Sequence, residues 1–263
     1  MKSIKIDLPD YNEIELHALS DLHIGDPMSD GKRILDTVEY IQKTPNAYCV
    51  LNGDLMDTAI KSSIGDLYGA ALQPMEQLKQ CVKIFEPIKG KILSVLPGNH
   101  EHRIYKADGI DTTALMCAQL GLQGRYTPTT ALLFIRFGQD PRHKSKNERL
   151  NRKLCYTAYC THGSGGGGRR EGGKINRLSD LASIVDADLY IHGHTHLPAV
   201  IKKNYFRSDK CKSCAKEITR TFVNTAAALN YGGYGDVQGY SPASRDNPVI
   251  YLSGTENRIT VKL

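Results

Sequence analysis

The side chains in this sequence best suited to chemistry are carboxylates and imidazoles that occur in short polar blocks. Asp21 and His23 stand two residues apart, and His194 and His196 repeat that spacing. Residues two apart on an extended segment project from the same face, so the side chains of each pair can approach one ion together. Asp54 follows a glycine, and a carboxylate in such a position can bridge two cations. These residue types and spacings predict a metal site.

Two further polar residues enlarge the set. Asn99 offers an amide oxygen, and His162 offers another imidazole. The mixture of oxygen and nitrogen donors, without a thiolate, suits Mn, Fe, Zn, Co or Ni better than Mg or Ca, which prefer oxygen alone. Seven donors with one bridging carboxylate fit two ions better than one, and a cation pair about 3.5–4 Å apart is the usual clamp for displacement at phosphorus. We therefore predict two divalent transition-metal ions, with Mn as first choice, and hydrolysis of phosphate esters.

The elements that must position these side chains are short strands. Each polar block ends an apolar run, and the runs cover residues 16–19, 47–51, 92–96, 154–160 and 189–191. Apolar residues at helical spacing lie between the runs, at Ile34, Val38 and Ile41, at Leu78, Val82 and Phe85, and at Ile175, Leu178, Leu181 and Val185. Strands alternating with helices predict an α/β fold with parallel pairing. Ligands gather beyond the carboxyl ends of such strands, so the blocks are expected to converge on one crevice.

The rest of the chain predicts how this domain is completed and where it resides. After about residue 198 the pattern changes to strands and turns, which predicts a mostly β layer that finishes a single domain spanning residues 1–263. No run approaches the roughly 20 apolar residues of a membrane helix. The charged start lacks the apolar core of a secretory signal. We therefore expect a cytoplasmic protein with no membrane partner.

Seven cysteines, an odd number, do not suggest a disulfide framework. Cys49, Cys81, Cys117, Cys155 and Cys160 sit inside apolar runs and are predicted to be buried thiols.

The other two cysteines form a separate motif. Cys211 and Cys214 make a C-x-x-C without a second pair nearby, whereas zinc ribbons use four ligands. A hairpin turn that carries two thiols is the favoured interpretation, and a zinc knuckle shared between two copies is the alternative.

Taken in order, the polar blocks resemble those of a known superfamily. Asp21-x-His23, Gly53-Asp54, Gly98-Asn99-His100-Glu101, His162-Gly163 and Gly193-His194-x-His196 look like the five blocks of the calcineurin-like metallophosphoesterases. One block alone arises by chance, but five ordered blocks that each end an apolar run are specific. The resemblance covers residues 21–196 and implies a metal-dependent phosphoesterase. Its fold would be an α/β (α+β) two-sheet β-sandwich flanked by helices.

The resemblance also implies a role for each residue. Asp21, His23 and His196 would hold the first metal, Asn99, His162 and His194 the second, and Asp54 would bridge them. Hydroxide formed at the metals would attack phosphorus, while His100, which is not a ligand, would protonate the leaving oxygen as general acid. Asp57 matches a G-D-x-x-D variant in which this second acid orients His100.

Basic residues suggest how an anionic substrate is held. Arg103 follows the asparagine block and could bind a phosphate oxygen bidentately. A glycine-rich run after His162 ends in Arg169 and Arg170, and we interpret it as a cationic lip beside the metals, with a plain surface loop as the alternative. The net charge of +6 and the basic segments 142–153 and 202–220 favour anionic partners. Nucleic acid is compatible with this charge, although such segments are also typical of solvated loops.

Together these features favour a phosphodiesterase that acts on a nucleotide or nucleic acid. The alternatives are a small-molecule phosphomonoesterase or nucleotide phosphatase, and a non-catalytic module that kept the metal cradle. The superfamily's lipid-precursor pyrophosphatases show Gly-Asn-Arg where this chain has Gly98-Asn99-His100, which argues against that branch. Thr58-Ala59 after Asp57 argues against the protein serine/threonine phosphatases, which carry longer signature blocks with arginines. The sequence leaves the oligomeric state open.

Overall fold

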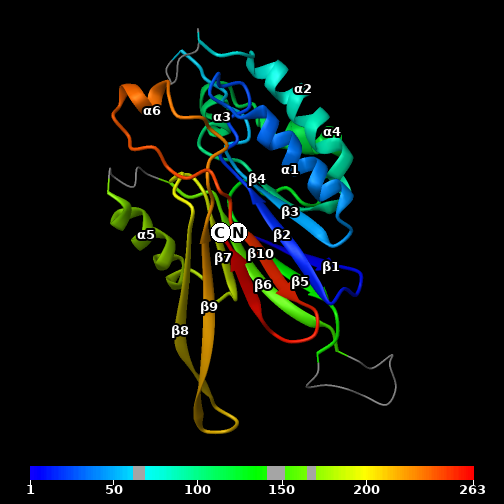
Figure 1. The fold of residues 1–263 in the computed structure, drawn as a ribbon. Coiled ribbons are helices and arrows are strands. Elements are labelled where there is room, and N and C mark those ends of the chain that lie inside the picture. The colour runs from blue at the N-terminus through cyan, green and yellow to red at the C-terminus, as the bar shows by residue number, and fades with distance from the viewer. Residues whose placement is uncertain (62–68, 141–151, 165–169) are drawn as a thin grey trace.

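Two β-sheets packed face to face form the centre of the molecule, with helices on both outer sides (Figure 1). The computed structural model describes residues 1–61, 69–140, 152–164 and 170–263. One sheet has the strand order β11-β10-β2-β3-β4, and the other has the order β1-β5-β6-β7-β9-β8. The strands are β1 (Lys2–Asp7), β2 (Glu13–Leu19), β3 (Ala47–Asn52), β4 (Ile92–Leu96), β5 (Ala131–Phe137), β6 (Leu154–Thr161), β7 (Leu189–His192), β8 (Ala199–Asp209), β9 (Cys214–Asn224), β10 (Val249–Ser253) and β11 (Ile259–Lys262). The expected two-sheet α/β architecture is confirmed.

The helices cover the two outer faces unequally (Figure 1). They are α1 (Gly31–Lys43), α2 (Pro74–Phe85), α3 (Glu101–Asp108), α4 (Thr112–Leu120), α5 (Glu171–Asp180) and α6 (Tyr234–Val237). Side chains of α1, α2 and α4 share an apolar cluster with β3 and β4 of the five-stranded sheet. Leu178 of α5 packs with residues of β5, β6, β7 and β9 of the six-stranded sheet. Each sheet is therefore covered on its outer side.

Helix α1 shows how the sequence specifies such a cover. Asp30 caps its first turn, because its side chain accepts a hydrogen bond from the backbone N–H of Arg33 at 3.1 Å. Ile34, Val38 and Ile41 recur at helical spacing and are all buried. The expected helix in this region is confirmed, and so is the one containing Leu78 and Phe85. The third expected helix is shorter than its pattern, because α5 ends at Asp180 and a 3₁₀ turn, Leu181–Ser183, follows.

β3, β4, β7 and the carboxyl-terminal half of β2, which lead to four of the polar blocks, are buried on both faces. In β2, Leu16 and Ala18 enter the cluster between the sheets, whereas Leu19 joins the cluster under the helices. This burial on both sides explains why the runs are apolar without alternation. Because β2, β3 and β4 pair in parallel, as do β6 and β7, their carboxyl ends lie at the same edge.

Parallel pairing does not extend through both sheets. β5 pairs antiparallel with β6, and β10 pairs antiparallel with β2. The region after residue 198 was expected to form one β layer, but it is divided between the two sheets. The β8–β9 hairpin extends the six-stranded sheet, and β10 and β11 extend the five-stranded one. The reason is that the chain crosses from one sheet to the other between residues 225 and 248, a segment that includes α6.

One cysteine prediction is wrong. Cys49, Cys81, Cys117 and Cys160 are buried as expected, but Cys155 is exposed. The side chains of β6 alternate, so Cys155 lies on the outer face of its sheet opposite Arg136 of β5. No helix that the structure describes is both long and apolar enough to cross a bilayer.

Candidate metal centre

All seven predicted metal ligands lie on loops that leave the carboxyl ends of five strands. Asp21 and His23 follow β2, Asp54 follows β3, and Asn99 follows β4. His162 directly follows β6, and His194 and His196 follow β7. The expected convergence on one crevice edge therefore holds.

The backbone at these loops is strained in a consistent way. Asp21 and His23 have φ angles of 54° and 47°, Asp54 has 49°, and His194 and His196 have 66° and 53°. A positive φ in a residue other than glycine costs about 1–3 kcal/mol and persists only where its surroundings impose it. The expectation that Asp21 and His23 share a face on an extended segment is wrong, since left-handed turns bring the two side chains together.

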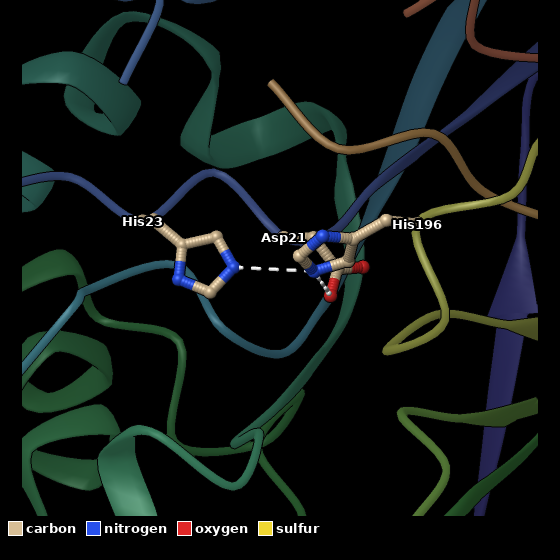
Figure 2. A group of neighbouring side chains, drawn as sticks. All are labelled: Asp21, His23 and His196. Carbon is tan, nitrogen blue, oxygen red and sulfur yellow. Dashed lines mark hydrogen bonds and ion pairs between the residues drawn. The ribbon is translucent and has the colours of Figure 1, made fainter. Parts of the chain in front are cut away.

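The first group of donors consists of Asp21, His23 and His196, shown in Figure 2. Asp21 Oδ1 lies 3.1 Å from His196 Nε2, and His196 Nε2 lies 3.4 Å from His23 Nε2. All three ligand atoms lie within 4.8 Å of one another. Two imidazole nitrogens that face each other cannot both donate hydrogen bonds, whereas both can offer lone pairs to one cation. This group therefore fits a metal ion.

The second group consists of Asp54, His162 and His194, with Asn99 at its edge. Asp54 Oδ2 lies 3.1 Å from His162 Nε2, which lies 3.2 Å from Asn99 Oδ1. The ligand atoms of Asp54, His162 and His194 again lie within 4.8 Å of one another. The buried Nδ1 of His194 has no hydrogen-bond partner among the described residues. A buried polar atom without a partner is costly, and a cation could occupy such a position.

Asp54 links the two groups. Its carboxylate oxygens also lie within 4.8 Å of His23 and His100 in a third cluster, so it stands between the donors of both groups. Asp54 is 1% exposed. Burial raises the pKa of this carboxyl, but the neighbouring His162, His100 and His23 outweigh burial and hold the pKa well below its ordinary range. A buried, ionised carboxylate close to both donor sets is suited to bind a cation.

His100 lies beside this cluster and is held from two sides. Its Nδ1–H donates to the backbone O and to Oδ1 of Asp57, at 2.8 and 3.1 Å. Burial lowers the pKa of His100, but its hydrogen bond to Asp57 and the charge of Asp54 outweigh burial, so the pKa lies above its ordinary value. Asp57 therefore contacts the ring that the sequence predicted it to orient.

The three arginines expected to bind substrate differ in their placement. Arg103 Nη2 lies 2.9 Å from His100 Nε2, and its Nη1 donates to the backbone O of Asp57 at 3.3 Å. Arg170 is exposed at the residue that precedes α5. Arg169 and most of the glycine-rich run lie outside the described residues. Of the three, the structure places Arg103 against the centre.

Sequence reasoning gave no role to Glu101, the last residue of the asparagine block. It is 2% exposed, and its carboxylate accepts hydrogen bonds from the backbone N–H groups of Gly98, Met56 and Asp54 at 2.7, 2.8 and 3.1 Å. Glu101 therefore ties the loop after β4 to the loop that carries Asp54. The sequence offered one signal for this contact: Glu101 stands three residues after Gly98 in the same polar block.

Removing that carboxylate is expected to destabilise the fold. Glu101→Ala leaves three buried N–H groups without partners, each of which costs about 1–3 kcal/mol. We expect the free energy of unfolding, measured by urea denaturation, to fall by about 3 kcal/mol or more. Glu86→Ala, at an exposed ion pair with Lys89, is the matched control and should change it by less than about 0.5 kcal/mol. An equal change in the free energy of unfolding for the two variants would contradict this role of Glu101.

The sequence also gave no indication of a role for Asn224, which supports the loop that carries His194 and His196. Its Oδ1 accepts from His192 Nδ1 at 2.7 Å, and its Nδ2 donates to Thr195 Oγ1 at 2.8 Å. Asn224 ends β9, more than 25 residues after the loop, so no local pattern could reveal the contact.

Proton release should accompany metal binding at this centre. Burial lowers the pKa of His162, but the charges of Asp54 and Asp21 outweigh burial and raise the pKa to about 10. The metal-free protein therefore carries a proton on His162 at neutral pH, and a ligating imidazole must lose it. Burial lowers the pKa of His23 to about 3, so His23 should release none. Titration calorimetry with Mn²⁺ at pH 7.5, in buffers of different ionisation heats, should report about one proton released.

The pH dependence of this effect has a defined sign. The raised pKa means that His162 stabilises the metal-free fold fully below pH 6.5 and that this stabilisation is lost as the pH rises through about 10. Metal affinity should therefore rise with pH over the same window. Calorimetric heats that do not depend on the buffer would show that His162 is not the proton donor.

Comparison with known proteins gave one family match. A sequence model described as "Calcineurin-like phosphoesterase" matches residues 16–198. The search of curated proteins found no match. Solved structures with a related arrangement include a predicted phosphoesterase from Streptococcus pneumoniae, with 13% identity, a TM-score of 0.34, and coverage of 95% of this chain and 97% of the other.

Two further solved structures are similar at the same low level. A Vps29 single mutant from Entamoeba histolytica shows 16% identity and a TM-score of 0.42, and the match covers 94% of this chain and 90% of the other. A metallophosphoesterase from Sphaerobacter thermophilus shows 12% identity and a TM-score of 0.35, with coverage of 91% and 84%. Assignment to a family rests on the sequence match, which covers well over half of the chain.

Proposed function

This chain belongs to the calcineurin-like phosphoesterase family and is a metal-dependent phosphoester hydrolase, and from that premise we propose that it cleaves phosphodiesters of the nucleotide class at a dinuclear centre. The observation that carries the dinuclear part is the position of Asp54. Its carboxylate is close to His23 on one side and to His162 and His194 on the other. One buried acid shared by two donor groups supports two ions better than one.

We assign the ligands by these groups. Asp21, His23 and His196 would hold one ion, Asn99, His162 and His194 would hold the other, and Asp54 would contact both. The donors mix oxygen with imidazole nitrogen, which suits Mn²⁺ first and also Fe, Zn, Co or Ni. When bound, such a pair lowers the pKa of water and neutralises charge on the phosphate oxygens.

His100 is the residue that we assign to the leaving group. Asp57 fixes the ring through Nδ1, which leaves Nε2 as the atom that transfers a proton. In the structure Arg103 Nη2 donates to that nitrogen at 2.9 Å, and this contact requires Nε2 to be unprotonated. For His100 to act as an acid, Arg103 must leave it, and the phosphate of a substrate is an anion that can bind the guanidinium instead.

The charge around the centre favours a diester. A phosphomonoester carries almost two negative charges near neutral pH, whereas a diester carries one. Among the described residues, the cation beside His100 is Arg103, and once released from His100 it can offset one negative charge. A single guanidinium beside the metals suits the less charged substrate.

The basic segment 202–220 supports a short substrate over a long polyanion. It forms most of the β8–β9 hairpin, which begins just after the metal loop and runs away from it (Figure 1). Its lysines therefore do not form a track that flanks the centre. Most of the other basic segment, 142–153, lies outside the described residues. A nucleotide diester fits these facts better than a nucleic-acid duplex.

Turnover of paired model esters tests this proposal. With Mn²⁺ added, we expect kcat/KM for bis-p-nitrophenyl phosphate to exceed that for p-nitrophenyl phosphate by about tenfold or more, which corresponds to about 1.4 kcal/mol. A dinucleotide and a single-stranded oligonucleotide are compared in the same assay. Preference for the monoester would favour a phosphomonoesterase. No turnover of either ester with any of the five metals would favour a module that binds metal without catalysis.

A further inference from the structure

The β8–β9 hairpin reaches well beyond the sheet to which it belongs (Figure 1). Its two strands pair along their full length, from Ala199 opposite Asn224 to Asp209 opposite Cys214. The 11 residues of β8 carry the tip about 30 Å from the metal loop, at about 3.3 Å per residue. The tip is therefore separate from the phosphoesterase centre.

Two free thiols occupy this tip. Cys211 and Cys214 are both exposed, in contrast to the buried cysteines of the core. The turn that carries them is fixed, because Asp209 Oδ1 accepts hydrogen bonds from the backbone N–H groups of Cys211 and Lys212 at 3.0 and 3.1 Å. Ser213 adopts a φ of 49° to close it. A turn with this ordered backbone and a C-x-x-C spacing is the usual unit by which a zinc site takes two thiolates.

The described residues of one copy do not complete such a site. Structural zinc takes four ligands in a tetrahedron. Among the described residues, the groups of three or more candidate ligands do not include either cysteine. The nearby Oδ1 of Asp209 is occupied by the two backbone N–H groups. The tip therefore offers half of a ligand set.

We propose that the hairpin tips of two copies of this chain share one Zn²⁺, held by Cys211 and Cys214 of each copy. A twofold contact places the same surface of both copies together, so two half-sites form one complete Cys₄ set. Soft thiolates favour zinc over Mn²⁺, the metal proposed first for the phosphoesterase centre. The length of the hairpin keeps both phosphoesterase centres away from the contact.

The charges at the tip fit this arrangement and make it depend on the metal. Four thiolates and one Zn²⁺ carry a net charge of −2, which exposed Lys210 and Lys212 of each copy can offset. Without the metal and the thiolates, the same lysines would repel one another. Phe206, 76% exposed on β8, adds apolar surface near the contact. The two tips should therefore associate with zinc and separate when zinc is removed.

Cobalt spectroscopy and mass measurement test the proposal together. Co²⁺ added to the reduced, metal-free protein should give a thiolate-to-cobalt charge-transfer band, which nitrogen and oxygen ligands of the phosphoesterase centre cannot produce. Light scattering coupled to size exclusion should give twice the chain mass with Zn²⁺ and a single chain mass after chelation. The double variant Cys211→Ser/Cys214→Ser should lose both signals, whereas Cys155→Ser, at an exposed cysteine outside the hairpin, should keep both.

The possible outcomes separate this site from the proposed function. Both variants should retain phosphoester hydrolysis, so inactivity of the wild-type protein would bear on the function and not on the tip. Absence of the charge-transfer band, a band from a protein of single-chain mass, or a Cys211–Cys214 disulfide in the freshly isolated protein would each overturn the shared site. So would zinc-dependent dimers of the double variant.

Discussion

Replacing Asp54 by alanine is expected to lower phosphodiester hydrolysis by about 10³-fold or more and to reduce the number of metal ions bound. The carboxylate is buried and lies against donors of both groups, so its removal affects both ions. Loss of several kcal/mol of charge stabilisation at the phosphate corresponds to about three or more factors of ten in rate. The measurements are kcat/KM with bis-p-nitrophenyl phosphate and metal content after dialysis.

A matched variant separates this effect from loss of a carboxylate in general. Asp36→Ala removes an exposed acid of α1 that pairs with Lys32 at 3.2 Å, and its activity and metal content should equal those of the wild type. Circular dichroism should show that both variants are folded. An Asp54→Ala protein that is folded and fully active would refute the role of Asp54.

Replacing His100 by alanine is expected to lower the rate by about 10²- to 10⁴-fold, the usual contribution of a general acid, while both metal ions remain bound. The ring lies outside the two donor groups assigned to the metals and is fixed by Asp57. Its raised pKa keeps it able to carry a proton near neutral pH. Metal content therefore distinguishes the two variants. His100→Ala should keep both ions, whereas Asp54→Ala should bind fewer.

The leaving group provides an internal control for His100. A good leaving group such as p-nitrophenolate needs little protonation, whereas the alcohol released from a dinucleotide needs it. The loss caused by His100→Ala should be larger for the dinucleotide. Equal losses for the two substrates would indicate that His100 positions the substrate and does not donate a proton.

Much of the fold could be predicted because the apolar runs are long enough to define strands. The runs at 47–51 and 92–96 correspond to β3 and β4, and glycine or proline after each run indicates where it ends. β1 and β5 were not predicted. They pair with each other in parallel although their sequences are almost 130 residues apart, and no local spacing reveals such a contact.

The sequence predicted which candidate ligands lie together, but not the backbone conformation that positions them. Asp21 and His23 lie in one group of candidate ligands, as expected. Left-handed backbone conformations, with φ of 54° and 47°, bring their side chains together. Neither residue type requires that conformation, so the sequence could not show it. The contacts of Glu101 and Asn224 with the site loops depend on tertiary packing in the same way. The sequence therefore indicates which side chains can bind a metal, but not the strained backbone conformation that positions them.

That strain supports the interpretation of the loops as a binding site. A positive φ at Asp21, Asp54 and His194 costs stability, and hydrogen bonds from neighbouring loops maintain the geometry. The backbone N–H of His194 donates to Asp21 Oδ1 and Oδ2 at 3.0 Å, and the N–H of His100 donates to Asp54 Oδ1 at 2.9 Å. The loops thus brace one another through hydrogen bonds of the protein itself.

The most direct test of the proposed dinuclear centre is anomalous diffraction from crystals grown with Mn²⁺. We predict two anomalous peaks about 3.5–4 Å apart, one beside His23 and His196 and the other beside His162 and His194, with the carboxylate of Asp54 in contact with both. A single peak, or a pair of peaks that Asp54 does not touch, would contradict the account.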